Sequence, residues 1–261
     1  MMGYKAYFVD MDGVIWVGSK IIEEAVRAVN ILHEREKIVI FLTNNSTRSR
    51  TSYVKALSDA GIKWASERHV VSSGYATALY LKKLYGGGKA YVVGESGLME
   101  ELISQGFEIA EPEDCWDKVD FVVVGMDRKF DYEKLWNAMT AVRNGAVYIA
   151  TNMDPTFPSE RGLAPGAGAI VAAISTGAGK SPDIVVGKPS RIMFDIAVEI
   201  AGTSNALVIG DRLDTDIVGA KSAGLDSLLV LTGVTKPDDL KKSDVKPNYV
   251  LNSLIDILNI I

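Results

Sequence analysis

The sequence predicts an α/β protein with a doubly wound parallel sheet and an inserted second α/β domain. Short apolar runs, rich in β-branched and aromatic residues, alternate along the 261 residues with segments whose apolar residues recur at helical spacing. Parallel strands need crossover connections, which are usually helical, so this alternation favours a parallel sheet covered on both faces. The triplet Gly86-Gly87-Gly88 interrupts the series, and a new series begins after it, which predicts an insertion.

The first predicted strand is the apolar run from Ala6 to Val9, which leads directly into Asp10-Met11-Asp12-Gly13-Val14. A helix that covers the sheet is predicted next, because apolar residues recur at helical spacing: Ile22, Ala25, Val26, Val29 and Leu32. The run from Ile38 to Leu42 predicts a second buried strand. This strand also ends in polar residues, Thr43-Asn44-Asn45-Ser46.

The inserted domain is expected to span residues 81–183, between two segments of a Rossmann-like core at residues 1–80 and 184–261. A helix from about Thr47 to Gly61 precedes it, since glycine suits the left-handed end of a helix. Within the insertion, four elements are predicted before a long loop: strands at 90–93, 121–124 and 147–150, and a helix at 98–104.

That loop contains Asn152-Met153-Asp154-Pro155 and leads to a turn and an apolar helix over residues 169–175. Residues 176–183, rich in Gly, Ser and Pro, predict the return crossing to the core. A strand at 184–186 then ends at Gly187-Lys188-Pro189, and a helix runs from Ser190, a suitable N-cap, to Gly202.

The last part of the chain continues the same alternation. A buried strand at 206–210 ends in Asp211-Arg212-Leu213-Asp214-Thr215-Asp216. Strands at 227–231 and 249–250 and a terminal helix at 253–258 complete the predicted core.

Composition narrows the class of protein. No apolar run is long enough to cross a bilayer, and the net charge of −5 argues against a nucleic-acid polymer as the partner. The single cysteine, Cys115, leaves no internal disulfide to form, which fits a reducing compartment, and we expect a cytoplasmic protein without a membrane partner. An exposed face of the inserted domain could support a homodimer.

Four separate predicted strands end in residues of the types that bind metal ions or phosphate or take part in catalysis. They supply Asp10 with Asp12, Thr43 with Asn44, Lys188, and Asp211 with Asp216. Each group taken alone is explained by helix capping and turn formation. Because the carboxyl ends of parallel strands share one edge, the four together favour a site for a hard cation and a phosphate. Carboxylate oxygens suit Mg²⁺, and with only two histidines and one cysteine, zinc is disfavoured.

These four strand-end groups resemble the four motifs of the haloacid dehalogenase superfamily in order, strand placement and spacing. Thr43-Asn44-Asn45-Ser46, Gly187-Lys188-Pro189, the segment from Gly210 to Ile217 and the large insertion are similar to the type IIA capped phosphatases, the nitrophenylphosphatase and nucleotidase-like group. The resemblance covers essentially the whole chain. It implies a Mg²⁺-dependent phosphatase for small phosphate monoesters, with the insertion as a cap domain.

The resemblance also implies a role for each motif residue. Asp10 would attack phosphorus to form an aspartyl-phosphate, and Asp12 would protonate the leaving oxygen and then deprotonate the attacking water. The side chains of Asp10 and Asp211 and the backbone carbonyl of Asp12 would hold Mg²⁺. Residues at the other strand ends would bind the phosphoryl oxygens: Thr43, Asn44, Asn45 and Lys188. Asp216 would orient Lys188 or metal-bound water, with Asp214 as a rival for that role.

Several assignments have alternatives. Asn152 and Asp154 could select the leaving group, or they could only form a turn. Trp16 could provide an apolar wall of the site or could belong to the core. The same intermediate could serve a phosphotransferase or mutase, and a phosphometabolite-binding protein without catalysis is the remaining alternative. The sequence does not identify the phosphate ester.

Overall fold

The computed structural model describes residues 3–159 and 162–259 and divides the chain into two compact units. The core unit comprises Met1–Thr43, Tyr53–Val71 and Lys188–Ile261, and the cap unit comprises Asn44–Ser52 and Ser72–Gly187. Residues 1–2, 160–161 and 260–261 lie outside the described residues. The sequence predicts an insertion at 81–183, whereas the cap unit also takes in residues 44–52, 72–80 and 184–187. The strand predicted at 184–186 as part of the core therefore belongs to the cap sheet.

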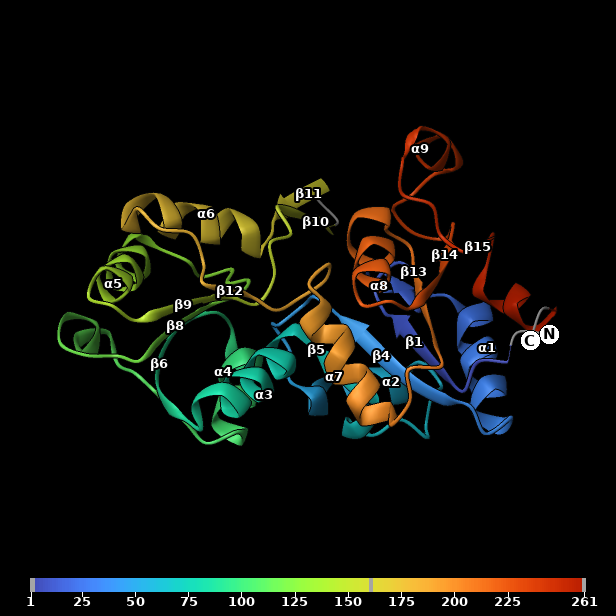
Figure 1. Cartoon of the computed structure of the whole chain (residues 1–261), viewed down its shortest axis with the longest axis horizontal. Helices are drawn as coiled ribbons and strands as arrows, with labels where there is room; N and C mark the ends of the chain where they lie inside the picture. The colour runs from blue at the N-terminus through green and yellow to red at the C-terminus, as the bar shows by residue number, and fades with distance from the viewer. Residues whose placement is uncertain (1–2, 160–161, 260–261) are drawn as a thin grey trace. The chain divides into compact units, whose positions relative to one another are not determined.

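The core unit contains a six-stranded sheet in the order β15-β14-β13-β1-β4-β5 (Figure 1). Its strands are β1 (Ala6–Asp10), β4 (Ile38–Thr43), β5 (Val70–Ser72), β13 (Ala206–Gly210), β14 (Asp226–Val230) and β15 (Tyr249–Leu251). β1 lies between β4 and β13 and is parallel to both. The strands that precede the insertion, β4 and β5, lie on one side of β1, and the strands that follow it, β13, β14 and β15, lie on the other. The predicted doubly wound sheet is confirmed, and its switch point lies at β1, where such sheets bind ligands.

Helices cover this sheet because one side of each helix is apolar. α1 (Glu23–Glu34) and α2 (Arg50–Asp59) bury side chains in a cluster with Tyr7 and Val9, which are alternate residues of β1. α7 (Arg191–Ala201) and α8 (Val218–Ser222) contact β4 and β14 respectively. The Ser190 side chain accepts a bond from the N–H of Ile192, and Gly202 ends α7 in the left-handed conformation, as predicted.

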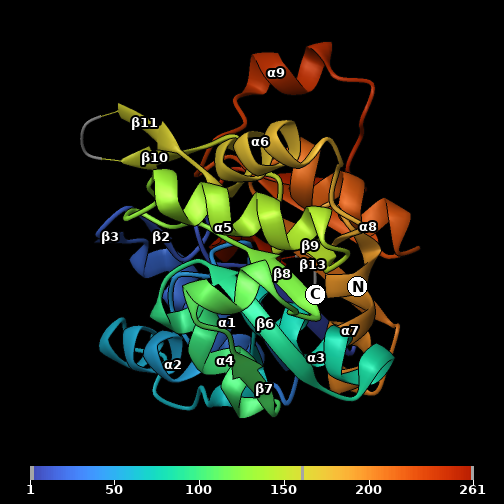
Figure 2. The same cartoon turned by 90° about the vertical axis from the view of Figure 1, so that its left-hand side faces the viewer.

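The cap unit has its own five-stranded sheet in the order β12-β9-β8-β6-β7, and neighbouring strands in it pair in parallel. Its strands are β6 (Gly88–Val93), β7 (Phe107–Ile109), β8 (Phe121–Val124), β9 (Val147–Ala150) and β12 (Ile184–Val185). Figures 1 and 2 show α5 (Tyr132–Arg143) and α6 (Ala167–Ala178) on one face, and α3 (Ser73–Tyr85) and α4 (Ser96–Ser104) on the other. Both units are therefore α/β layers with independent cores.

Some predicted elements have different bounds. α2 begins at Arg50 rather than near Thr47, because the Asn45 side chain accepts the N–H and O–H of Thr47 and forms a turn first. α6 extends into the start of the stretch predicted as a crossing, to Ala178, and is capped by Gly179, which has φ of +71°, so the crossing to β12 comprises only residues 179–183. The long loop of the insertion contains a hairpin of β10 (Thr156–Ser159) and β11 (Gly162–Pro165).

The remaining elements are short. They are a hairpin of β2 (Trp16–Val17) and β3 (Lys20–Ile21), the helix α9 (Pro237–Lys242), 3₁₀ helices at Glu67–His69, Pro112–Trp116 and Leu254–Asn259, and a π-helical turn at Leu213–Ile217. The terminal helix predicted at 253–258 is thus a 3₁₀ helix. Among the described residues, none of the helices is long and apolar enough to span a bilayer.

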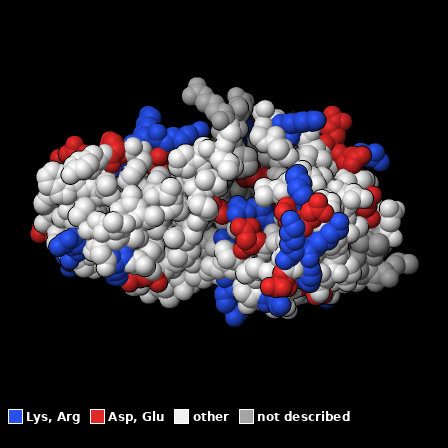
Figure 3. Space-filling model, turned by 90° about the horizontal axis from the view of Figure 1, so that it is seen from above, with Lys and Arg blue, Asp and Glu red and all other residues white. Residues whose placement is uncertain are grey.

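Charged side chains of both signs lie together over α9 on the face seen in Figure 3. Lys241, for example, pairs with Asp238 at 3.0 Å. Much of the rest of this face belongs to other residues, and α6 contains no charged residue. Within this view the described residues form no extended basic patch of the kind that a nucleic-acid backbone selects.

Candidate active site

The strand ends of the core unit bring several of the predicted residues to one edge of the sheet. Asp10 is the last residue of β1, Thr43 is the last residue of β4, and Asp211 follows the last residue of β13. β1 is parallel to both neighbours, with Asp10 opposite Leu42 in the β4 pairing. The three side chains are therefore placed at the same edge by strand register, as the sequence pattern predicts.

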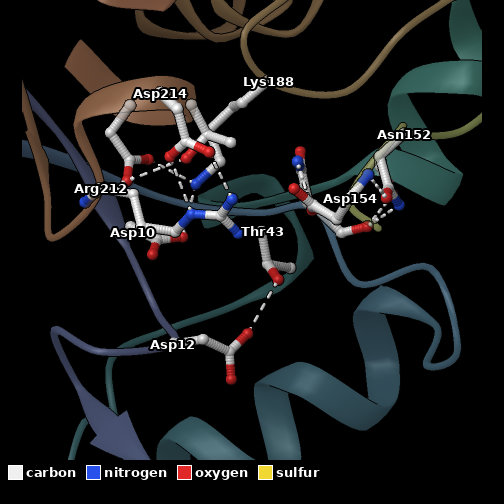
Figure 4. Close-up of polar contacts among 12 residues, drawn as sticks. Asp10, Asp12, Thr43, Asn152, Asp154, Lys188, Arg212 and Asp214 are labelled. Atoms are coloured by element: carbon white, nitrogen blue, oxygen red, sulfur yellow. Dashed lines mark hydrogen bonds and ion pairs between the residues drawn. The ribbon is translucent and has the colours of Figure 1, made fainter. Parts of the chain in front are cut away.

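Lys188 connects two carboxylates in this edge (Figure 4). Its Nζ donates to Asp10 Oδ1 and to Asp216 Oδ1, each at 2.6 Å, and all three side chains are buried. Burial by itself lowers the pKa of Lys188, but the charges of the two carboxylates outweigh burial and raise that pKa. Lys188 therefore remains a cation, and its charge favours the ionised form of Asp10.

Asp10 also experiences strong opposing effects. Burial raises the pKa of Asp10 well above its usual range, Lys188 lowers it, and the neighbouring carboxylates of Asp216, Asp211 and Asp12 raise it again. A buried carboxylate surrounded by others is stabilised in its ionised form only by positive charge. The site consequently favours a ligand or side chain that supplies such charge next to Asp10.

Asp211 has one satisfied and one unsatisfied oxygen. Its Oδ2 accepts the backbone N–H of Val234 at 2.6 Å, whereas its buried Oδ1 has no hydrogen-bond partner among the described residues. Burial, with a contribution from Asp216, raises the pKa of Asp211 to about 6. A buried carboxylate oxygen without a partner is costly unless a cation or water approaches it.

The carboxylates of Asp10, Asp211 and Asp216 form the group that could hold a metal ion, because one oxygen of each lies within 4.8 Å of the others. Glycine permits this crowding. A Cβ atom at Gly13 or Gly233 would collide with the Asp211 carboxylate. These glycines keep the space around the acidic cluster open.

The segment after β13 decides which of two aspartates reaches Lys188. Arg212 holds the exposed Asp214 in a two-pronged ion pair, with its Nε at 3.1 Å from Oδ1 and its second nitrogen at 2.7 Å from Oδ2. Asp216 is buried, and its Oδ2 accepts the Arg212 backbone N–H at 3.2 Å. The π-helical turn therefore directs Asp216 to Lys188 and leaves Asp214 with Arg212.

Asp12 has different surroundings from Asp10. It is exposed, and Figure 4 shows its carboxyl group directed toward Thr43 and apart from the Asp10–Lys188 pair. Thr43 Oγ1 donates to Asp12 Oδ2 at 3.3 Å, and the indole Nε1 of Trp16 donates to Asp12 Oδ1 at 3.0 Å. The contact with Trp16 is one that sequence reasoning missed, since the pattern only suggested an apolar wall or a core residue.

The predicted phosphate-binding residues Asn44 and Asn45 belong to the cap unit although they directly follow β4. Asn44 Nδ2 donates to Asp154 Oδ2 at 2.9 Å, and the Asn44 carbonyl accepts bonds from Asn152 Nδ2 at 2.7 Å and from Ser73 Oγ at 2.6 Å. No sequence pattern pointed to Ser73, because nothing distinguishes it from an ordinary first residue of a helix.

The two candidate cap residues differ in exposure. Asn152 is buried, and its Oδ1 accepts the N–H of Asp154 at 3.1 Å while its Nδ2 is held by the Asn44 carbonyl. Asp154 is only half-buried, and Figure 4 shows it beside Asn152. Gly166 and Gly168 lie close to this loop, where an added Cβ would collide with the carbonyls of Asp154 and Met153 respectively.

Comparison with known proteins identifies the family to which these motifs belong. A model of haloacid dehalogenase-like hydrolases matches residues 7–108, and a second model of HAD-hydrolase-like proteins matches residues 185–257. The chain is 36% identical over 260 residues to an acid sugar phosphatase of Staphylococcus saprophyticus, covering 99% of this chain and 98% of the relative. It is also 36% identical over 258 residues to the 5′-nucleotidase YutF of Bacillus subtilis, covering 98% of each.

Comparison with a solved structure supports the same family assignment. The p-nitrophenyl phosphatase from Archaeoglobus fulgidus superimposes with a TM-score of 0.93 at 38% sequence identity and covers 99% of both chains. The family models include the segments that carry Asp10, Thr43, Lys188 and Asp211, and the predicted resemblance is confirmed. The chain belongs to the haloacid dehalogenase-like hydrolases, and its named relatives in that family are phosphatases and nucleotidases.

Proposed function

We propose that this protein is a Mg²⁺-dependent phosphatase that hydrolyses small phosphate monoesters through an aspartyl-phosphate on Asp10. The observation that carries the proposal is the Lys188 contact with Asp10 and Asp216 beside the unsatisfied Asp211. This arrangement supplies a carboxylate as the nucleophile, a cation beside it for the phosphoryl oxygens and an acidic position for a metal.

The residues fit a hard divalent cation. Three carboxylates and one lysine leave an excess of negative charge when all are ionised, and the buried Oδ1 of Asp211 has no hydrogen-bond partner among the described residues. We assign Mg²⁺ to the side chains of Asp10 and Asp211 and to the backbone carbonyl of Asp12. Mg²⁺ bound there would supply positive charge that offsets the charge on the phosphoryl oxygens. Asp216, whose oxygens accept bonds from Lys188 and Arg212, has the role of orienting Lys188.

The reaction then divides into two displacements at phosphorus. In the first, an Asp10 oxygen bonds to phosphorus, the bond to the ester oxygen breaks, and Asp12 gives its proton to that oxygen. In the second, water bonds to phosphorus while Asp12 takes its proton, and the bond to Asp10 breaks to release inorganic phosphate. Lys188 and Thr43, together with Asn44 and Asn45, bind the phosphoryl oxygens, and such groups act by stabilising developing charge.

The substrate is assigned only to the class of small phosphate esters, such as nucleotide, sugar or aryl phosphates. The named relatives differ in the esters after which they are called, although all share the phosphoryl end. We propose that the cap loop with Asn152 and Asp154 selects the leaving group: Asp154, the more exposed of the two, would contact the ester, and the buried Asn152 would hold the loop through its bonds to the Asn44 carbonyl and the Asp154 N–H. A cytoplasmic location is part of the proposal, supported by the single cysteine of the chain. A homodimer formed through the cap remains part of it as well.

Phosphate release from a panel of esters tests the function. We expect turnover that requires Mg²⁺, stops with a chelator and returns when Mg²⁺ is restored. Asp10→Asn should lower kcat by roughly 10⁴-fold or more on every ester, because the nucleophile is lost. Unchanged turnover in Asp10→Asn would exclude the mechanism.

Two further measurements separate the alternative functions. Faster transfer of phosphate to a sugar or alcohol than to water would identify a phosphotransferase. Tight binding of phosphate esters by the wild-type protein, without turnover of any of them, would identify a binding protein instead.

A further inference from the structure

The indole of Trp16 has a polar contact that the proposed reaction does not yet explain. Trp16 Nε1 donates to Asp12 Oδ1 at 3.0 Å, while Thr43 Oγ1 donates to Asp12 Oδ2 at 3.3 Å. Each oxygen of the Asp12 carboxyl group therefore has a side-chain donor of its own. Both donors are uncharged, in contrast to the lysine that contacts Asp10.

The backbone fixes the indole relative to Asp12. The Met11 carbonyl accepts the N–H groups of Val14, Ile15 and Trp16, and the Gly13 N–H donates to the Trp16 carbonyl at 2.7 Å. Trp16 then begins the β2–β3 hairpin, and its half-buried ring packs against the core cluster. Since the loop between Asp12 and Trp16 is closed by its own hydrogen bonds, the indole N–H is held in place before any substrate arrives.

The chemistry of the donor limits what it can do. The indole N–H donates a hydrogen bond and cannot accept one, and it does not exchange its proton in the range where carboxyl groups act. Trp16 can therefore orient the Asp12 carboxyl group without competing with it for the proton that the reaction moves. Asp12 is exposed, and a side chain in water would otherwise sample several rotamers.

We propose that Trp16 is a positioning residue that holds the Asp12 carboxyl group in the orientation needed for proton transfer to the leaving oxygen. The inference rests on the proposed function, since it assigns Trp16 to the acid step of that reaction. It predicts that loss of the indole N–H harms esters with a strongly basic leaving oxygen. Esters whose leaving group departs readily as an anion should be much less affected, because they need little help from an acid.

Comparing two esters isolates this step. We measure kcat/KM, which covers binding and the first displacement, for an alkyl phosphate and for 4-nitrophenyl phosphate. Trp16→Phe keeps an aromatic ring and removes the N–H, and we expect kcat/KM to fall about 10-fold for the alkyl ester and less than about 2-fold for the nitrophenyl ester. An equal fall on both esters, or no fall on either, would overturn the proposal.

Trp64 provides a matched control in the same unit. Its Nε1 donates to Asn30 Oδ1 at 2.8 Å, so Trp64→Phe also removes one indole hydrogen bond. Neither Trp64 nor Asn30 has a role in the proposed reaction. We expect the ratio of the two kcat/KM values to stay as in the wild type. A ratio that changes as much as in Trp16→Phe would show that the effect is structural.

Two additional variants keep the test decisive. In an Asp12→Asn background, Trp16→Phe should leave the ratio of the esters unchanged, because the group that Trp16 positions is already lost. If Trp16→Phe does not fold, site-specific replacement of the indole by its benzothiophene isostere removes only the N–H and gives the same readout. Failure of the proposed function would look different: the wild type itself would release no phosphate from either ester.

Discussion

The acidic cluster of the core unit and the amide network of the cap unit both follow the ends of parallel strands, yet they are satisfied in different ways. Asn44 and Asn152 donate and accept within their own network, which also includes Asp154. Asp10 and Asp211 can only accept when they are ionised, so they depend on donors from other residues, Lys188 for Asp10 and the backbone N–H of Val234 for Asp211. A cluster of acceptors needs donors or cations from outside the cluster, whereas amides can satisfy one another.

The largest expected effect is the loss of Lys188 in the acidic cluster. Lys188→Met leaves the buried carboxylates of Asp10 and Asp216 without their shared donor, and we expect a loss of about 3–5 kcal/mol in the free energy of unfolding together with loss of turnover. Burial raises the pKa of Asp10, so its folded value lies above its unfolded value once the lysine is gone. Stability is then lost as pH rises through the raised folded pKa, and denaturation at about pH 5 and about pH 8 should show a larger deficit at the higher pH.

Lys134 of the cap unit is the matched control. Its Nζ contacts the buried Asp127 at 2.6 Å, but the Lys134 side chain is 31% exposed and holds a single carboxylate. Lys134→Met should cost only about 1 kcal/mol and leave kcat on every ester as in the wild type. An equal loss in the free energy of unfolding for Lys188→Met and Lys134→Met would show that the acidic cluster depends on its lysine no more than Asp127 of the cap unit does.

An intermediate effect is expected from the amide network. Asn152→Ala leaves the Asn44 carbonyl without one of its donors, and we expect a loss of about 1–3 kcal/mol of stability with the same order of preference among esters. Asp154→Ala should instead change the ratio of kcat/KM between nucleotide, sugar and aryl phosphates. If Asn152→Ala reorders the esters while Asp154→Ala does not, the roles assigned to these residues are reversed.

The smallest effect is expected at a pair in the cap unit that is open to water. The Glu95 carboxylate accepts two bonds from the Arg128 side chain, at 2.7 and 2.6 Å, and these bonds lower the pKa of Glu95. The Arg128 side chain is 69% exposed, so Glu95→Gln should cost less than about 1 kcal/mol near neutral pH.

The pH dependence of this pair is opposite to that of Lys188→Met. Because the folded pKa of Glu95 is depressed, its stabilisation is present above the unfolded pKa and is lost as pH falls through the folded value. Urea denaturation of wild type and Glu95→Gln should therefore converge below about pH 4. A difference that persists in acid would mean that the ion pair is not its cause.

Much of the fold could be predicted because local patterns and global architecture agree. Apolar runs such as the one from Ala6 to Val9 do become buried strands, and Ser190 and Gly202 do bound their helix. The predictions are wrong where the chain chooses between local alternatives. Gly and Ser in residues 176–183 suggested a crossing, but α6 continues to Ala178, which packs against the hydrophobic core of the cap unit, and the crossing to β12 begins only at Gly179.

The candidate site shows the same division. The order and spacing of Asp10, Thr43 and Asp211 were sufficient to predict their common edge, because parallel strands align their ends. The sequence also assigned the strand before Lys188 to this sheet, whereas that strand, β12, belongs to the cap sheet, and it is the Lys188 side chain that reaches Asp10. Nothing in the sequence could show that Trp16 contacts Asp12, since a tryptophan after a turn has many orientations available. The choice of Asp216 over Asp214 depended on the π-helical turn, which has no recognisable pattern.

The sequence by itself determined the two α/β layers, the strand-end residues and the family, since each depends on periodicity or on the order of residues along the chain. Only the tertiary structure decided which polar atoms are left unsatisfied. Among the described residues Asp211 Oδ1 is buried without a partner, whereas Asn152 donates to the carbonyl of Asn44, a residue distant in sequence. Burial and hydrogen bonding are properties of the packed chain, so no pattern along the sequence reveals which polar atoms they leave unsatisfied.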